Sequence, residues 1–236
     1  MSIYVIGDLH LSFGQDKPMD IFGENWNEHA SKIKDNWIKL IKDQDLIVIP
    51  GDLSWGINLQ EAYKDFEFLN NLPGKKILLK GNHDYWWTTV TNMNNFLQQN
   101  GFDTIQFLHN NSYFYENKII CGTRGWSFTD TENSTKMINR ENERLKLSIE
   151  SGIKEYGHEK EIIIFMHYPP ISQATLKQEK DMEILQTLKQ YNVKKCYYGH
   201  LHGTSHKDAI EGNIENIDFK LISADYLNFK PYKITE

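Results

Sequence analysis

Short aliphatic and β-branched runs recur along the chain, separated by segments with helical periodicity. We interpret seven runs as strands, at residues 3–6, 46–49, 76–79, 119–121, 162–166, 195–198 and 219–222. Runs this short and apolar are typical of strands buried on both faces. One-sided apolar patterns predict helices near residues 33–41, 59–69, 137–156 and 176–191, and residues 18–26 and 123–135 are interpreted as loops. This alternation predicts an α/β fold with helices packed on sheet faces.

Five of these strands are followed by polar residues of one chemical kind. The residues are carboxylates, imidazoles and one amide: Asp8 and His10, then Asp52, then Asn82, His83 and Asp84, then His167, then His200 and His202. Ligands of open α/β sheets bind beyond the carboxyl ends of the strands. If the strands are parallel neighbours, we expect all five clusters to meet at one sheet edge.

Carboxylate and imidazole side chains, with an amide oxygen, are the donors that divalent transition metals accept. The set is too large for one ion, so a pair of ions bridged by a central aspartate is the simplest interpretation. Residues two apart in an extended segment project to the same side, so Asp8 and His10 can face one ion, while His200 and His202 can reach the two neighbouring ions. The mixed nitrogen and oxygen donors fit manganese, iron or zinc.

Taken in order, the motifs D-x-H, G-D, G-N-H-D, a single H after a strand, and G-H-x-H resemble the calcineurin-like metallophosphoesterase superfamily, and they span residues 8–202. The resemblance implies a four-layer αββα sandwich of two mixed β-sheets flanked by helices. It also implies two metal ions. The ligands implied for one are Asp8, His10, Asp52 and His202, and those for the other are Asp52, Asn82, His167 and His200, with Asp52 as the bridge.

The resemblance further implies a metal-dependent phosphoric ester hydrolase. A hydroxide between the two ions is expected to attack phosphorus in line, since metal ions lower the pKa of bound water. His83 would be the catalytic histidine beside the leaving group, and Asp84 is expected to hold its imidazole in place.

The second motif departs from the protein Ser/Thr phosphatase branch, which continues it as GDxxDRG. Here Trp55 and Gly56 stand where that branch has its acidic residue and its phosphate-gripping arginine, which disfavours a phosphoprotein substrate. Arg124 follows a strand and is the best candidate for a two-pronged phosphate contact. Arg140 and Arg144 are expected to be solvated or paired with a neighbouring glutamate.

We therefore favour a phosphoesterase acting on a small phosphorylated substrate, with a slight preference for a phosphodiester or nucleotide-like compound. A phosphomonoesterase, a protein phosphatase and a non-catalytic metal-binding scaffold of the same fold are the alternatives. A serine or cysteine hydrolase is set aside, because the sequence has no GxSxG motif. Aromatic core packing is expected for Trp86 and Trp87, and a surface position for His29, His109 and His158.

Length and charge limit the remaining classes. The 236 residues favour a single domain over residues 1–236. A formal net charge of −6 disfavours a broad nucleic-acid surface. No apolar run approaches the roughly 18 residues of a membrane span, and the N-terminus lacks a signal-peptide pattern. Cys121 and Cys196 are far apart and outside any CxxC motif, which favours small buried side chains and a reducing, cytoplasmic location.

Overall fold

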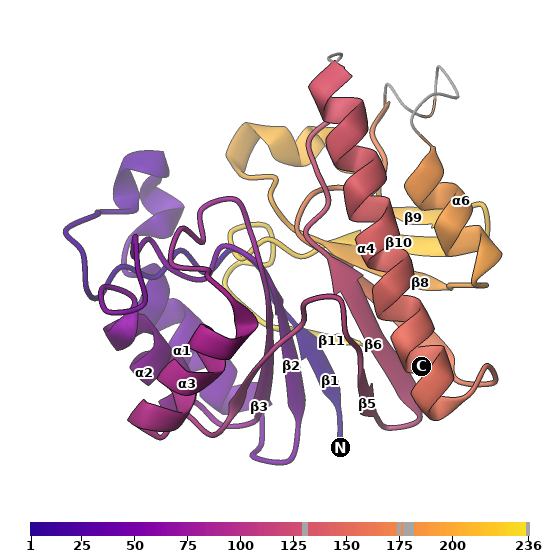
Figure 1. The fold of residues 1–236 in the computed structure, drawn as a ribbon. Helices are drawn as coiled ribbons and strands as arrows, with labels where there is room; N and C mark the ends of the chain where they lie inside the picture. The colour runs from indigo at the N-terminus through magenta and orange to yellow at the C-terminus, as the bar shows by residue number, and fades with distance from the viewer. Residues whose placement is uncertain (129–131, 174–175, 177–181, 235–236) are drawn as a thin grey trace.

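The computed structural model describes residues 1–128, 132–173, 176 and 182–234. Its strands form two mixed sheets (Figure 1). The first sheet has the order β11-β1-β2-β3-β4 and contains β1 (Ile3–Val5), β2 (Leu46–Pro50), β3 (Lys75–Leu79), β4 (Ile105–Phe107) and β11 (Tyr232–Ile234). β11 is antiparallel to β1, and the other four strands are parallel.

The second sheet has the order β5-β6-β7-β8-β10-β9. Its strands are β5 (Tyr113–Tyr115), β6 (Lys118–Thr123), β7 (Glu161–Met166), β8 (Lys195–Tyr198), β9 (Gly212–Ile214) and β10 (Ile217–Leu221). The four central strands are parallel, and the edge strands β5 and β9 are antiparallel to their neighbours. All seven predicted strands are therefore present, and none of their ends is shifted by more than two residues.

The helices lie on the outer faces of the two sheets. They are α1 (His29–Leu40), α2 (Tyr63–Asn71), α3 (Val90–Asn100), α4 (Glu132–Tyr156) and α6 (Glu183–Gln190), with short 3-10 turns η1 (Asp20–Phe22), η2 (Glu24–Trp26) and η3 (Gly203–Asp208). The loop expected at 123–135 is wrong at both ends, because Thr123 belongs to β6 and α4 begins at Glu132. The helix expected at 176–191 is present as α6, and residues 177–181 lie outside the described residues.

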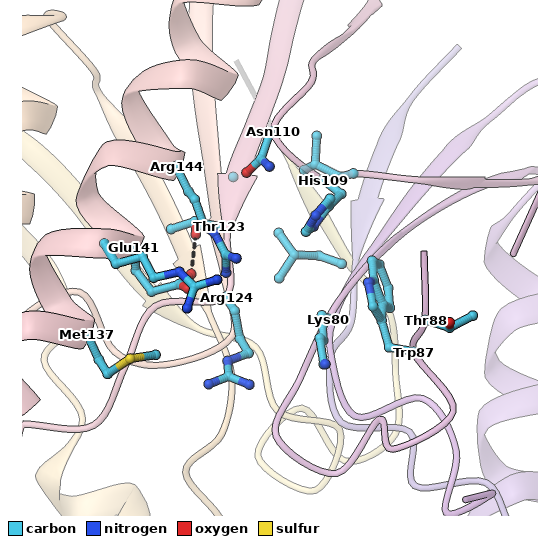
Figure 2. Close-up of a pocket in the computed structure, with 14 residues that line it drawn as sticks. Lys80, Trp87, Thr88, His109, Asn110, Thr123, Arg124, Met137, Glu141 and Arg144 are labelled. Carbon is cyan, nitrogen blue, oxygen red and sulfur yellow. Dashed lines mark hydrogen bonds and ion pairs between the residues drawn. The ribbon is translucent and has the colours of Figure 1, made fainter. Parts of the chain in front are cut away.

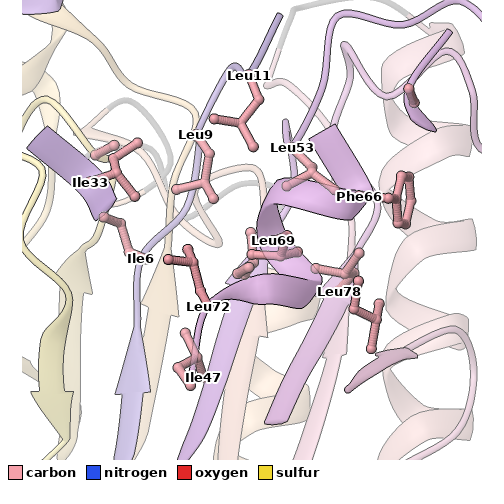
Figure 3. Close-up of a cluster of buried hydrophobic side chains, with 14 of the residues drawn as sticks. Ile6, Leu9, Leu11, Ile33, Ile47, Leu53, Phe66, Leu69, Leu72 and Leu78 are labelled. Carbon is pink, nitrogen blue, oxygen red and sulfur yellow. The ribbon is translucent and has the colours of Figure 1, made fainter. Parts of the chain in front are cut away.

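Three apolar clusters separate four layers. The first packs α1, α2 and α3 on the first sheet through residues such as Trp37, Phe66 and Met93, and Figure 3 shows part of it. The second packs α4 and α6 on the second sheet. The third, which includes Val48, Ile77 and Phe165, fills the space between the sheets. The layer order is thus αββα, and the predicted fold class is confirmed.

The five polar clusters come from two sheets, so the expectation of one shared sheet edge is wrong. β1, β2 and β3 belong to the first sheet, whereas β7 and β8 belong to the second. The sheets meet just beyond their carboxyl ends. There the Gly7 amide donates to the Ile222 carbonyl at 2.9 Å, and the Gly7 carbonyl accepts from the Ala224 amide at 3.0 Å. None of the described helices combines the length and apolar composition needed to cross a bilayer.

Candidate metal centre

The backbone is strained where the polar clusters meet. Asp8, His10, Asp52 and His200 have φ angles of 59°, 45°, 52° and 73°, although none of them is glycine. Such left-handed conformations cost on the order of 1–3 kcal/mol each and persist at functional sites, where the surrounding structure enforces them. Four of the seven predicted metal ligands are held in this way, which points to a built site.

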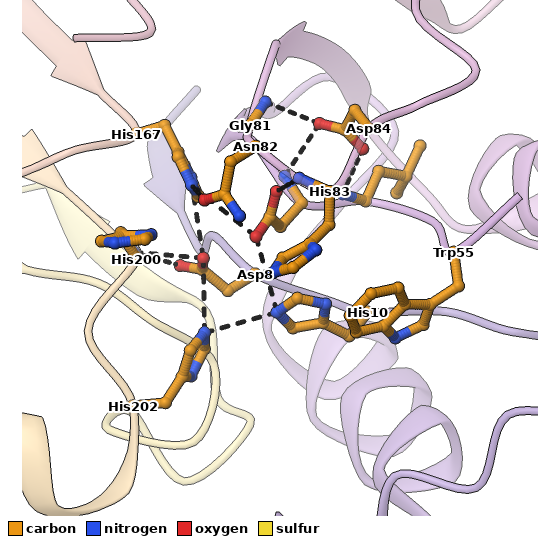
Figure 4. A network of polar contacts seen from close by, with 12 residues as sticks. Asp8, His10, Trp55, Gly81, Asn82, His83, Asp84, His167, His200 and His202 are labelled. Carbon is orange, nitrogen blue, oxygen red and sulfur yellow. Dashed lines mark hydrogen bonds and ion pairs between the residues drawn. The ribbon is translucent and has the colours of Figure 1, made fainter. Parts of the chain in front are cut away.

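Backbone hydrogen bonds align the loops that follow β1 and β2. The amides of Asp8 and His10 donate to the carbonyls of Gly51 and Asp52 at 3.0 and 2.9 Å. Leu9, beside them, is completely buried in the first apolar cluster. Figure 4 shows the side chains of Asp8 and His10 in one polar network, and Asp52 Oδ2 lies 3.7 Å from His10 Nε2.

Two groups of metal-donor atoms result. Asp8, His10 and His202 form one, Asp8, Asp52 and His167 form the other, and in each group the donor atoms lie within 4.8 Å of one another. Asp52 Oδ2 lies 3.7 Å from His10 Nε2 and 3.6 Å from His167 Nε2, so this carboxylate faces both groups.

The remaining predicted ligands lie at the edges of these groups. Asn82 Oδ1 is 2.7 Å from His167 Nε2. The backbone amide of His200 bonds both carboxylate oxygens of Asp8 at 3.1 Å, and its ring lies 5.1 Å from that of His167. All seven predicted ligands are therefore brought together, and their binding of metal stays a prediction.

Burial and the neighbouring charged groups shift the pKa values of these side chains. Burial and the charge of Asp8 raise the pKa of Asp52 to about 8. Burial alone would raise the pKa of Asp8, but the hydrogen bond and charge of His202 outweigh it and lower that pKa. Burial and His167 lower the pKa of His200 to about 3, which leaves a neutral imidazole suited to ligation. Two buried carboxylates surrounded by imidazole nitrogens fit a pair of divalent cations.

Several groups that orient these side chains were not predicted. Asp225 Oδ1 accepts from His202 Nδ1 at 2.8 Å, and the Pro50 carbonyl is 3.1 Å from His167 Nδ1. Such partners fix the tautomer that leaves Nε2 free for a metal. His29, expected at the surface, is buried instead and contacts the His10 carbonyl at 3.2 Å. No sequence motif marks Asp225, which lies in the segment after β10.

The structure corrects the expected role of Asp84. Its carboxylate accepts from the amides of Asp52, Leu53 and Gly81 at 2.9, 2.9 and 2.7 Å and from the Trp86 indole at 3.0 Å. It therefore ties the loops after β2 and β3 together and does not hold the His83 imidazole.

The His83 ring has other neighbours, since it lies 4.5 Å from the Trp55 ring and 5.6 Å from the His10 ring, measured between ring centroids. The His83 amide donates to Asp52 Oδ1 at 2.8 Å. His83 is thus fixed beside the donor groups through its backbone, while its ring faces the aromatic side of the site.

A sequence profile of the calcineurin-like phosphoesterase family matches residues 1–204, and so covers both donor groups. The chain belongs to this family. A comparison with curated proteins finds no sequence relative.

Several solved structures share the phosphoesterase fold at low identity. A phosphopantetheinyl hydrolase from Mycobacterium tuberculosis is 12% identical, with a TM-score of 0.57, over 99% of this chain and 95% of that one. A protein from Thermus thermophilus is 12% identical, with a TM-score of 0.58, over 99% and 97%. A protein of unknown function from Aquifex aeolicus is 18% identical, with a TM-score of 0.52, over 98% and 95%.

In this calcineurin-like phosphoesterase, Trp55 forms one wall of a cavity beside His10 and His83. Its ring stacks on that of His10 at 5.0 Å between centroids, and the Lys17 amine lies 3.3 Å from the centre of a Trp55 ring. The cavity measures about 480 Å³ and is lined by His10, Met19, Phe22, Trp26, Trp55, His83, His202, Gly203 and Thr204. An apolar, aromatic space therefore opens directly on one of the two donor groups.

Arg124, the predicted phosphate contact, lies outside both donor groups. Its guanidinium is 4.6 Å from the Trp126 ring and 5.9 Å from the Tyr168 ring. The Tyr168 ring in turn lies 4.2 Å from the His200 ring. Arg124 is therefore separated from His200 by one aromatic side chain.

Arg144 pairs with Glu141 at 2.6 Å, as predicted, and Trp86 and Trp87 are in the first apolar cluster.

Proposed function

We propose that this protein is a binuclear metal-dependent hydrolase of small organic phosphate esters, with phosphodiesters or nucleotide-like compounds preferred. The observation that carries the proposal is the place of Asp52, whose Oδ2 lies 3.7 and 3.6 Å from imidazole nitrogens of the two donor groups. A shared carboxylate of this kind favours two cations side by side over a single ion. Membership of the phosphoesterase family supports the same chemistry.

We propose that Asp8, His10, Asp52 and His202 hold one ion and that Asp52, Asn82, His167 and His200 hold the other. Manganese, iron and zinc suit this mixture of imidazole and carboxylate donors. When bound, such ions supply hydroxide at neutral pH and offset the charge of the phosphate. The protein contributes the spacing of the donors, which the strained loops and the Asp84 carboxylate maintain.

His83 is the proposed proton donor to the leaving group. Burial and the nearby His167 lower its pKa. The negative charge of a bound phosphate ester acts in the opposite direction and favours the protonated imidazole that a general acid requires. General acid assistance of this kind contributes about 10²–10⁴-fold in rate. Asp84 acts on the loops and is therefore a positioning residue.

The aromatic cavity supports an organic substrate. Its walls include Trp26, Trp55 and Phe22, which would cover the apolar part of an ester group next to His83. Trp55 and Gly56 stand in place of the acidic residue and the arginine of the protein phosphatase branch, so we do not propose a phosphoprotein substrate. One similar fold belongs to a protein named as a phosphopantetheinyl hydrolase, and that likeness shows the fold alone.

We propose a cytoplasmic location and a small-molecule partner. Cys121 and Cys196 are free and buried, which is compatible with a reducing compartment. Burial raises the pKa of both thiols, so neither is activated as a nucleophile.

A substrate panel on metal-reconstituted protein tests the function. The metal-free protein is loaded with Mn²⁺, Fe²⁺ or Zn²⁺ and assayed with an aryl phosphate monoester, a bis-aryl diester, cyclic nucleotides and dinucleotides. We expect the wild type to hydrolyse the diesters and to bind two ions per chain by metal analysis. Asp52→Asn should lose the activity and the two-ion content, whereas the control Asp65→Asn should keep them. Turnover of the monoester alone would contradict the diester preference. Two bound ions without turnover of any ester would favour the scaffold alternative.

A further inference from the structure

A second cavity lies at the carboxyl ends of β3 and β6, against α4, and measures about 300 Å³ (Figure 2). Four cationic side chains line it, Lys80, Arg124, Arg140 and Arg144, which we call the arginine pocket. They include all three arginines of the sequence. Glu141 is the one carboxylate among the lining residues, so the pocket carries a net charge of +3 in a chain whose net charge is −6.

The single carboxylate is already satisfied. Glu141 is 1% exposed, accepts from the Thr123 hydroxyl at 2.6 Å and pairs with Arg144 at 2.6 Å. Among the described residues, no ion pair involves Lys80, Arg124 or Arg140. Arg124 Nε is buried and has no hydrogen-bond acceptor. A buried guanidinium nitrogen without an acceptor costs free energy that a bound anion would recover.

The cationic side chains come from opposite walls of the cavity. Figure 2 shows Glu141 and Arg144 from α4 on one side of the cavity and Lys80 and Trp87 on the other. Guanidinium groups in such an arrangement present paired N–H donors that match the oxygens of a phosphate group.

Two walls of the arginine pocket lead to residues of the proposed metal centre. Lys80 directly precedes Gly81, which packs against the Asp52 carboxylate, and Asn82, which contacts His167. On the opposite wall, the guanidinium of Arg124 contacts the Tyr168 ring, which covers His200. A molecule with its scissile phosphate at the donor groups could therefore extend a second group into this pocket.

We propose that the arginine pocket binds a second phosphate group of the substrate, so that the preferred substrate carries two phosphate groups, one of which is hydrolysed. The inference rests on the proposed function for the scissile phosphate, but anion binding in the pocket does not depend on it. The pocket selects the substrate by charge, whereas the donor groups act on the ester bond.

Binding is tested first, on metal-free protein, with inorganic pyrophosphate as the probe in calorimetric titrations. We expect saturable binding that weakens by about tenfold or more in Arg140→Gln and in Arg124→Gln, the loss typical of a charge-assisted contact. Lys154→Gln is the matched control, because it also removes one positive charge, at an exposed position of α4 outside the pocket. Arg144→Gln is avoided, since it would leave the buried Glu141 charge unpaired. Absence of binding to the wild type, or equal binding by all variants, would overturn the proposal.

A kinetic assay then tests whether the anion bound in the pocket belongs to the substrate or is a separate effector. Thymidine 5′-(p-nitrophenyl phosphate) and its 3′-phosphorylated form present the same scissile diester without and with a second phosphate. We expect the ratio of their kcat/KM values to favour the 3′-phosphorylated form and to fall by about tenfold in Arg140→Gln but not in Lys154→Gln. Activation of the wild type by free pyrophosphate would instead show an effector site and contradict a substrate subsite. Pyrophosphate binding without hydrolysis of either ester would contradict the proposed function and leave the anion pocket standing.

Discussion

Replacement of Asp84 by asparagine separates two roles for this buried carboxylate. Asp84 Oδ2 accepts from the amides of Asp52 and Gly81, and Oδ1 accepts from the Leu53 amide and the Trp86 indole. An asparagine has one acceptor oxygen and one NH₂ group at the same positions. Whichever way the amide is turned, two buried N–H donors face another donor, so Asp84→Asn removes two hydrogen bonds.

The expected loss of folding stability follows from these two unpaired donors. A buried donor left without an acceptor costs about 1–3 kcal/mol, which gives about 2–6 kcal/mol for the pair. Burial and the charge of Asp52 raise the pKa of Asp84 to about 7. The buried negative charge is therefore unfavourable, and its removal offsets part of the free-energy cost. With metal ions present to balance Asp52, we expect the free energy of unfolding to fall by about 2–4 kcal/mol.

Asp65→Asn is the matched control, because this carboxylate is also buried and lies near the same loop. It accepts from the Phe13 amide at 2.8 Å and from the Ser54 hydroxyl. A hydroxyl can rotate and accept from an amide NH₂ group, whereas a backbone N–H cannot. We therefore expect Asp65→Asn to lower the free energy of unfolding by no more than about 1 kcal/mol.

Urea unfolding at pH 7 with saturating Mn²⁺, followed by tryptophan fluorescence and far-UV circular dichroism, measures both variants. Asp84→Asn should lower the midpoint at an unchanged slope and should also weaken metal binding, because the amides of Asp52 and Gly81 lose their shared acceptor. A stability equal to that of Asp65→Asn, with only kcat reduced, would refute this reasoning. That result would favour the sequence-based expectation that Asp84 acts on the His83 imidazole.

Three further predictions follow from the same geometry. His83→Ala should retain two metal ions by metal analysis and lose about 10²–10⁴-fold in kcat for diesters, and full activity or loss of metal would contradict its role as acid. Asp225→Asn should weaken metal binding by about 10–100-fold in a chelator competition, because the tautomer of His202 is no longer fixed, and unchanged affinity would count against this. Burial raises the pKa of Asp65 to about 6, so the folded protein binds this proton more tightly than the unfolded chain. The free energy of unfolding should therefore fall by up to about 3 kcal/mol as pH rises from about 4 to 6, and Asp65→Asn should lack this decrease when both are unfolded in urea across that range.

The central strands were predictable because burial on both faces leaves a continuous apolar run, as in 46–49 and 162–166. The edge hairpins were not. β5 and β6 are joined by Glu116 and Asn117, and β9 and β10 by Glu215 and Asn216, all with positive φ. Two-residue hairpin turns of this kind usually show Asn-Gly or Asp-Gly, and glutamate at the first position carries no such signal.

Helix α3 was also missed, for a different reason. Val90–Asn100 is rich in asparagine and buries only Met93 and Leu97, so its apolar periodicity is weak. Its ends did carry a signal, since the Thr89 side chain accepts from the Asn92 amide and Gly101 ends the helix with φ of 67°. Capping residues would thus have located a helix that hydrophobic patterning could not.

The residues that meet in the donor groups could be picked out from the sequence because each directly follows a strand, and strand ends are marked in sequence by the change from apolar to polar residues. Asp225 shows where this reasoning stops. It reaches His202 because the segment after β10 is joined to Gly7, beyond the end of β1, and this connection between the two sheets leaves no pattern in the local sequence. Carboxylates that orient ligands from such a junction become visible only in three dimensions.

The two cavities beside the proposed metal centre differ in chemistry, and this difference predicts an orientation for the proposed substrate. The aromatic cavity is lined by His10 and His202, whereas the arginine pocket reaches His200 through the Tyr168 ring, which Arg124 contacts. An ester whose apolar group occupied the arginine pocket would leave three net positive charges without a partner. A phosphate placed against Trp26 and Trp55 would lose its hydration without gaining comparable donors. If both proposals hold, the apolar group therefore lies beside His83 and departs with its proton, and the second phosphate stays with the part of the substrate held by the arginines.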